Sequence, residues 1–130
     1  MLSRRSLNAT LIAGLVGLAA LPAIASSAKF SADALKAAQA TGKPVLVDVT
    51  APWCPTCKAQ AAVLSELDKQ ERFKGFIKLA VDFDMQKDAL KTLNARMQST
   101  LIVFKGDKEV GRLVGDARKD AIEALLAKAL

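Results

Sequence analysis

The fold of this chain is decided by the stretch Pro44-Val45-Leu46-Val47-Asp48-Val49-Thr50-Ala51-Pro52-Trp53-Cys54-Pro55-Thr56-Cys57-Lys58. The β-branched apolar run over 45–50 predicts a strand buried on both faces, with one acid inside it. Ala51-Pro52 predicts a turn after this strand. A helix is expected to begin near Cys54 and to end at about Gln70, and its inner face is predicted to carry Ala59, Val63, Leu64 and Leu67.

The two cysteines carry the chemistry that this stretch can perform. A thiolate, and not a thiol, attacks a disulfide. The first turn of a helix stabilises negative charge through its free N–H groups and its dipole. We therefore expect Cys54 to be the exposed nucleophile and Cys57, one turn further on, to be the sheltered resolving thiol. Pro55 suits a helix start because its missing N–H would have no partner there.

Taken alone, two cysteines three residues apart also fit half of a zinc site, a structural disulfide or chance. The chain has 2 Cys and no His, so it lacks the other Cys or His ligands that a zinc site needs. A structural disulfide across so short a loop would stabilise the fold little. The order of strand, turn, cysteine pair and helix favours redox chemistry.

The rest of the chain alternates helices with strands. A helix capped by Ser31 is expected before the central strand, running to about Ala40. The later patterns predict a strand over 76–82, a helix over 85–94, a hairpin of strands over 101–104 and 109–114, and a helix over 117–128. We expect a three-layer α/β domain: a central mixed sheet of about four strands flanked by helices, with a C-terminal β-hairpin plus helix.

The stretch 44–58 resembles the strand and active-site signature of the thioredoxin family, and the similarity continues through 100–105 and 111–115. The resemblance implies a thiol-disulfide oxidoreductase with no cofactor beyond a redox-active Cys54–Cys57 disulfide. Residues 36–44 resemble the exported and membrane-linked reductase branches more than the cytosolic type, and the additional first strand of the cytosolic type is expected to be absent or vestigial in this chain. The substrate-binding residues implied are Trp53, Pro55, Thr56, Gln98, Ser99 and Thr100, with Trp53 as a packing platform beside Cys54.

Asp48 has two interpretations. An acid in an apolar strand is costly to bury, so it could be a strand-end residue that reaches solvent. The family places an acid six residues before the first cysteine, which favours a proton carrier behind Cys57 whose pKa is raised by desolvation. No lysine partner is expected, because the strand position that would align with one is Ala80.

The chain departs from the family in the loop that faces the cysteines. Ser99 stands where the family has a cis-proline directly before the Thr100 strand. A cis bond before serine costs roughly 2.5–4 kcal/mol, so the Gln98–Ser99 bond is expected to be trans. We expect weaker binding of unfolded substrates. The alternative is that Ser99 keeps the family's loop shape and changes little.

Residues 1–25 are predicted to be a signal peptide. Arg4 and Arg5 precede an apolar stretch from about Ala9 to Leu21, and Ala23-Ile24-Ala25 fits a cleavage site. Ser3-Arg4-Arg5-Ser6-Leu7 also resembles a twin-arginine export signal. Residues 26–130 then form one thioredoxin-like domain in the periplasm or another exported location. An uncleaved membrane anchor stays open as the alternative.

The composition excludes some classes of binding partner. The 130-residue chain has a formal charge of +6, but its lysines alternate with acids, and it has no Tyr and one Trp. We expect no nucleic-acid binding, no metal and a monomer. The favoured function is reduction of disulfides in exported proteins, with a membrane thiol-electron carrier or a partner domain as electron donor. A disulfide-introducing oxidase and a dithiol metal-handling or redox-regulated binding protein stay open as alternatives.

Overall fold

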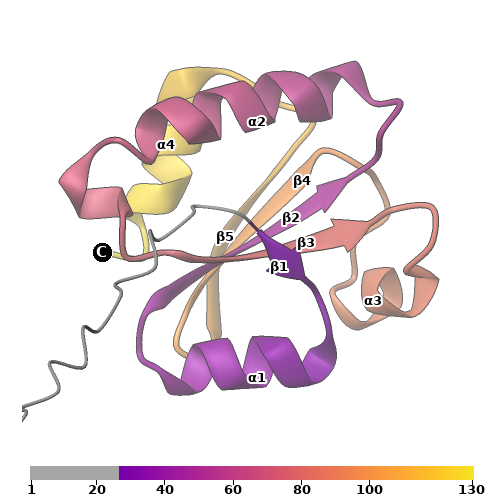
Figure 1. Cartoon of the computed structure of the whole chain (residues 1–130), viewed down its shortest axis with the longest axis horizontal. Coiled ribbons are helices and arrows are strands. Elements are labelled where there is room, and N and C mark those ends of the chain that lie inside the picture. Colours follow the sequence, from indigo (N-terminus) through magenta and orange to yellow (C-terminus); the bar gives the residue numbers. More distant parts are fainter. Residues whose placement is uncertain (1–26) are drawn as a thin grey trace, which may run out of the picture.

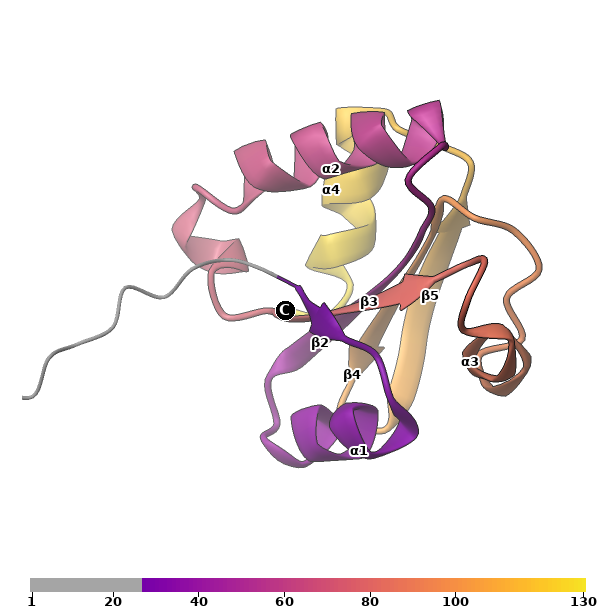
Figure 2. The same cartoon turned by 45° about the vertical axis from the view of Figure 1, so that its right-hand side comes forward.

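A computed structural model describes residues 27–130 as a five-stranded mixed sheet between two layers of helices (Figure 1). Helices α2 and α4 cover one face of the sheet, and α1 and α3 cover the other, as the turned view also shows (Figure 2). The elements are β1 (Ala28–Lys29), α1 (Ala32–Ala40), β2 (Pro44–Thr50), α2 (Pro55–Leu67), the 3-10 turn η1 (Glu71–Phe73), β3 (Ile77–Asp82), α3 (Lys87–Thr92), β4 (Thr100–Lys105), β5 (Lys108–Val114) and α4 (Lys119–Ala127).

The strand order is β1-β3-β2-β4-β5, with β2 in the centre. Strand β2 runs parallel to β3 and antiparallel to β4, and β4 and β5 form the predicted hairpin. The expected count of four strands omitted β1, which pairs only Ala28 with Leu79 and Lys29 with Ala80. The first strand of the family is thus present as a two-residue remnant.

Helix α1 has its predicted bounds, and the bounds of α2, α3 and α4 differ from the predicted ones by up to three residues. Ser31 caps α1, because its Oγ accepts the Ala34 N–H at 2.9 Å. Helix α2 was expected to reach Gln70 but ends at Leu67, and the chain continues through the 3-10 turn. Helix α3 is shorter than predicted at its start, since Asp82 Oδ1 accepts the Met85 N–H and holds that residue in a turn.

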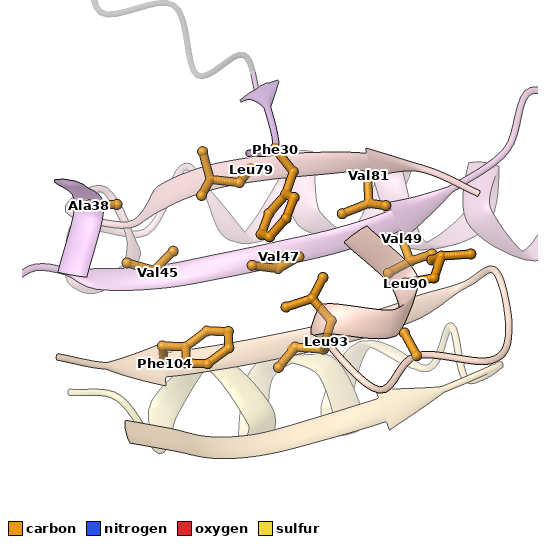
Figure 3. Packing of buried hydrophobic residues seen from close by; sticks show 12 residues of the cluster. Phe30, Ala38, Val45, Val47, Val49, Leu79, Val81, Leu90, Leu93 and Phe104 are labelled. Carbon is orange, nitrogen blue, oxygen red and sulfur yellow. The ribbon is translucent and has the colours of Figure 1, made fainter. Parts of the chain in front are cut away.

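The core has one layer on each face of the sheet. Alternate residues of β2 point in opposite directions, so Val47 enters the layer under α1 and α3, whereas Leu46 enters the layer under α2 and α4. Figure 3 shows the first layer, in which β2, β3 and β4 meet side chains from α3 and Phe30. Among residues 27–130, no helix is both long and apolar enough to cross a membrane. The predicted signal peptide lies outside the described residues.

Candidate active site

The cysteine pair lies at the start of α2, just after the turn that follows β2. Cys54 and Cys57 form a disulfide with their Cα atoms 5.3 Å apart. Cys54 is the N-cap residue of α2 and Pro55 is its first residue, as the sequence predicts. The Cys57 N–H donates to Cys54 Sγ at 3.1 Å. A backbone donor at a helix start is therefore aimed at the sulfur of Cys54, and the same donor stabilises a thiolate there after reduction.

Exposure does not separate the two cysteines. Cys54 is 2% exposed and Cys57 is 4% exposed, and both pack against Ala51 and Phe83. The prediction that Cys54 is exposed is wrong for the disulfide form, because the two cysteines form a buried cluster with Ala51 against which Phe83 packs. The assignment of Cys54 as the attacking sulfur instead rests on the helix-start N–H that its Sγ accepts.

Trp53 lies on the surface beside the disulfide and is 56% exposed. Its Nε1–H donates to Asp84 Oδ2 at 2.8 Å, and its ring meets Phe83 edge to face with 6.5 Å between centroids. Since Phe83 packs against the cysteines, Trp53 is held next to the site by two residues of the loop after β3. The sequence predicted the position of Trp53 but neither of these partners.

Asp48 lies in β2 opposite Ala80 of β3 and Leu101 of β4. Its Oδ1 atom is buried and has no hydrogen-bond partner among residues 27–130. Desolvation raises the pKa of the Asp48 carboxyl from 3.8 to about 6, and the charge of Lys78 opposes part of that rise. The acid therefore changes protonation close to neutral pH, which is what a proton carrier needs.

Asp48 forms no ion pair with a lysine of residues 27–130, but Lys78 of β3 lies near enough for its charge to act on the Asp48 carboxyl. Lys78 and Ala80 leave the same face of β3, so Lys78 lies diagonally across from Asp48. The Lys78 ammonium forms an ion pair with Asp68, the C-cap residue of α2. The three charged side chains line one cavity of about 120 Å³, together with Ser27, Leu46, Ala61, Leu64 and Ser65. The spacing of residues within one strand did not reveal that Lys78 lies near Asp48, because this proximity depends on the register between β2 and β3.

The loop before β4 has the predicted trans bond, but it does not present the Thr100 side chain for substrate binding. No peptide bond within residues 27–130 is cis, so the Gln98–Ser99 bond is trans as expected. Ser99 is buried and adopts φ +54°, in the left-handed region. Thr100 is also buried, and its hydroxyl donates to the Met97 carbonyl at 2.7 Å. The Thr100 side chain is thus turned away from the surface, whereas Pro55, Thr56 and Gln98 retain exposure.

Sequence reasoning missed Gln60. Ala59 was expected on the inner face of α2, but Ala59 is exposed and Gln60 is completely buried, at 0% exposure. The Gln60 Nε2 group donates to the carbonyls of Ser99 and Asp116, both at 3.0 Å. A polar residue on a helix is normally assigned to the solvent side, so nothing in the sequence pattern marks it as a core residue.

An open groove of about 770 Å³ lies on the β1–β3 side of the disulfide and has Cys57 in its wall. None of the predicted substrate-binding residues lines it, so the groove and the surface around Trp53 are separate approaches to the cysteines. Over the same range 27–130, no group of three or more His, Cys, Asp or Glu side chains is arranged to hold a metal ion.

Comparisons with known proteins agree on one family. The family model described as Thioredoxin matches residues 23–128. A Thioredoxin H-type of Brassica campestris is 36% identical over 94 residues, which are 72% of this chain and 74% of that protein. The solved structure of Trxlp from Edwardsiella tarda EIB202 is 40% identical with a TM-score of 0.74, over 78% of this chain and 98% of that one. Thioredoxin O2 from Arabidopsis thaliana, in its oxidized state, is 26% identical with a TM-score of 0.64, over 74% and 83% of the two chains.

Proposed function

Since the chain belongs to the thioredoxin family, and is a thiol-disulfide oxidoreductase acting through its own disulfide, we propose that it works as a reductase of disulfides in exported proteins. The observation that carries the chemistry is the disulfide at the start of α2, with the Cys57 N–H on Cys54 Sγ. The proposal of exported substrates is supported by the signal-peptide pattern in residues 1–25.

The reaction proceeds by two exchanges of sulfur. In the reduced protein the Cys54 thiolate attacks one sulfur of the substrate disulfide, and the other substrate sulfur leaves as a thiolate that takes up a proton. The Cys57 thiolate then attacks the Cys54 sulfur of the mixed disulfide. This second step forms the Cys54–Cys57 disulfide, releases the second substrate thiolate and completes the transfer of two electrons to the substrate.

We assign the proton of the second step to Asp48. Its carboxyl shares a cavity with Ala61, which lies one helical turn beyond Cys57 in α2. With a pKa of about 6 the carboxyl is ionised at neutral pH and can accept the Cys57 proton. Lys78 and Asp68 in the same cavity give that proton a polar route away from the disulfide.

The direction of electron flow is tested by the equilibrium of Cys54 and Cys57 with glutathione. A potential near that of thioredoxin, about −270 mV, supports reduction of substrates. A potential near −120 mV assigns the protein to the disulfide-introducing side instead. A pair that does not exchange with glutathione at all contradicts the oxidoreductase function.

The proposed location requires its own test. We propose that the domain is exported, with a membrane thiol-electron carrier or a partner domain as its electron donor, because exported thiols have no cytosolic reductant at hand. The mature protein from the periplasmic fraction is expected to begin near Ser26. An N-terminus that retains Arg4 and Arg5 in the membrane fraction supports the anchored alternative, and recovery from the cytosol contradicts export.

A further inference from the structure

The buried side-chain amide of Gln60 donates hydrogen bonds to two backbone carbonyls. Its side chain is 0% exposed, both of its hydrogen bonds come from Nε2, and its Oε1 has no partner within the part of the chain that the structure describes. A buried acceptor without a partner costs stability, and an apolar residue at this position would avoid that cost. The side chain therefore has a use that outweighs the cost.

The two carbonyls belong to loops that end different strands. Ser99 directly precedes β4, and Asp116 follows Gly115 after the end of β5. The Ser99 carbonyl also accepts the Gly115 N–H at 2.9 Å, so the two loops are joined to each other as well as to Gln60. Gln60 lies three residues after Cys57, on the same side of α2. One side chain thus links the helix of the cysteines to both loops.

Ser99 explains why such a link is needed. A proline at this position would restrict the backbone of the loop by its ring. Ser99 lacks that restriction and holds φ at +54°, a conformation that residues other than glycine adopt at a cost. Conformations of this kind persist when the surroundings hold them, and the Gln60 amide is a buried contact that does so.

We propose that Gln60 is a positioning residue that replaces the restraint of the family's proline. It holds Ser99 so that the backbone edge at the neighbouring, half-buried Gln98 can bind an extended polypeptide segment next to the substrate disulfide. This role rests on the proposed reductase function. It also implies selectivity for substrate class, since a polypeptide disulfide uses the backbone edge and a small aromatic disulfide does not.

The test compares Gln60→Leu and Gln60→Met, which keep the volume and remove the donors, with Gln39→Leu. Gln39 lies in α1 on the opposite face of the sheet, so Gln39→Leu is the same chemical change away from the loop. The probes are insulin as a polypeptide disulfide and dithiobis(nitrobenzoate) as a small one. Hydrogen exchange of the Gly115 amide reports on the loop itself.

We expect the KM for insulin to rise about 3- to 10-fold in both Gln60 variants, the factor for one ordinary hydrogen bond, with kcat and the small-disulfide rate nearly unchanged. The Gly115 amide should exchange faster, and Gln39→Leu should behave as the wild type. An unchanged KM for insulin, or an equal loss on both probes, overturns the proposal. If neither variant folds, rapid exchange of the Gln60 side-chain amide protons in the wild type would overturn it.

Failure of the reductase function and failure of the Gln60 role give different results. A wild-type protein that reduces neither probe contradicts the reductase function, and the role of Gln60 fails with it. A wild-type protein that reduces both probes, with Gln60 variants that match it, contradicts the role of Gln60 alone.

Discussion

The two faces of the central sheet are built for different purposes. Under α1 and α3 the layer is mostly apolar, with Val45, Val47 and Val49 of β2 meeting Leu79 and Leu90 (Figure 3), and Thr100 is the buried polar residue opposite Val49. Under α2 and α4 the same strand contributes Leu46 and the acid Asp48, and the buried Gln60 and the half-buried Lys78 add further polar groups. The polar groups of this second face come from both the sheet and the helices, since Asp48 and Lys78 lie on β2 and β3 and Gln60 lies on α2.

The comparison shows where stability and chemistry are separated. Apolar burial stabilises the fold by roughly 25 cal/mol per Å², so the α1/α3 face contributes stability without other demands. The α2/α4 face carries a desolvated acid and an amide oxygen that has no hydrogen-bond partner among residues 27–130, and each of them lowers stability. These are the groups to which we assign proton transfer and the positioning of the loop before β4.

The largest effect is expected from the cysteines. Cys57→Ser should abolish turnover and accumulate a mixed disulfide between Cys54 and the substrate, because no second thiol can release it. Non-reducing electrophoresis and mass spectrometry of the adduct measure this. Cys54→Ser is the matched control and should trap nothing. Trapping by Cys54→Ser alone would reverse the assignment of the two sulfurs.

A pair of leucine truncations compares the two faces directly. Leu79→Ala and Leu46→Ala should each lower the free energy of unfolding by about 2–5 kcal/mol, because each removes a buried side chain and leaves a cavity. Leu46 also lines the Asp48 cavity, so its truncation should admit water and lower the pKa of Asp48, whereas Leu79→Ala should not. Denaturation and pH–rate profiles measure both effects. Equal pH–rate profiles in the two variants would remove the distinction between the faces.

Asp48→Asn should raise the free energy of unfolding and lower the rate of thiol exchange. The folded chain binds the Asp48 proton more tightly than the unfolded chain, so wild-type stability falls as pH rises from about 3.8 to about 6 and stays lowered above that. A shift of about two pKa units corresponds to about 3 kcal/mol, which is the upper limit of the gain at pH 8. Denaturation at pH 4 and pH 8 measures it.

The same variant should exchange thiols more slowly near neutral pH, since Cys57 loses its proton acceptor. A reduction rate that matches the wild type from about pH 6 to pH 8, a range that begins at the pKa of the Asp48 carboxyl, would make Asp48 a structural residue only.

The smallest effect is expected from Asp68→Asn. Losing its ion pair frees the Lys78 ammonium to act on Asp48, which should move the pKa of Asp48 below about 6 and shift the pH–rate profile to lower pH. The change in stability should be about 1 kcal/mol or less. The control is Glu66→Gln, which removes an exposed acid of α2 that pairs with Lys119 of α4. A profile that does not move would show that Lys78 acts on Asp48 regardless of Asp68.

Most of the fold could be predicted because its signals are local. The β-branched run of β2, the cap at Ser31 and the hairpin turn after β4 each act within a few residues, and their order implies a mixed sheet. Element ends were less predictable. Helix α2 stops at Leu67 and α3 starts at Lys87 because of contacts made at the turns, such as that of Asp82 with the Met85 N–H.

The candidate site likewise combines features that the sequence predicts with features that only the tertiary structure decides. The sequence by itself determined the cysteine pair at a helix start, the acid six residues before it and the serine in place of proline, since these are facts of residue type and spacing. Only the tertiary structure decided that Lys78 faces Asp48, that Asp68 binds Lys78 and that Gln60 is buried against Ser99. Those contacts depend on the register between strands and on the rotation of α2 over the sheet. Both are set by packing among elements distant in the chain, for which no local pattern of residues is a signal.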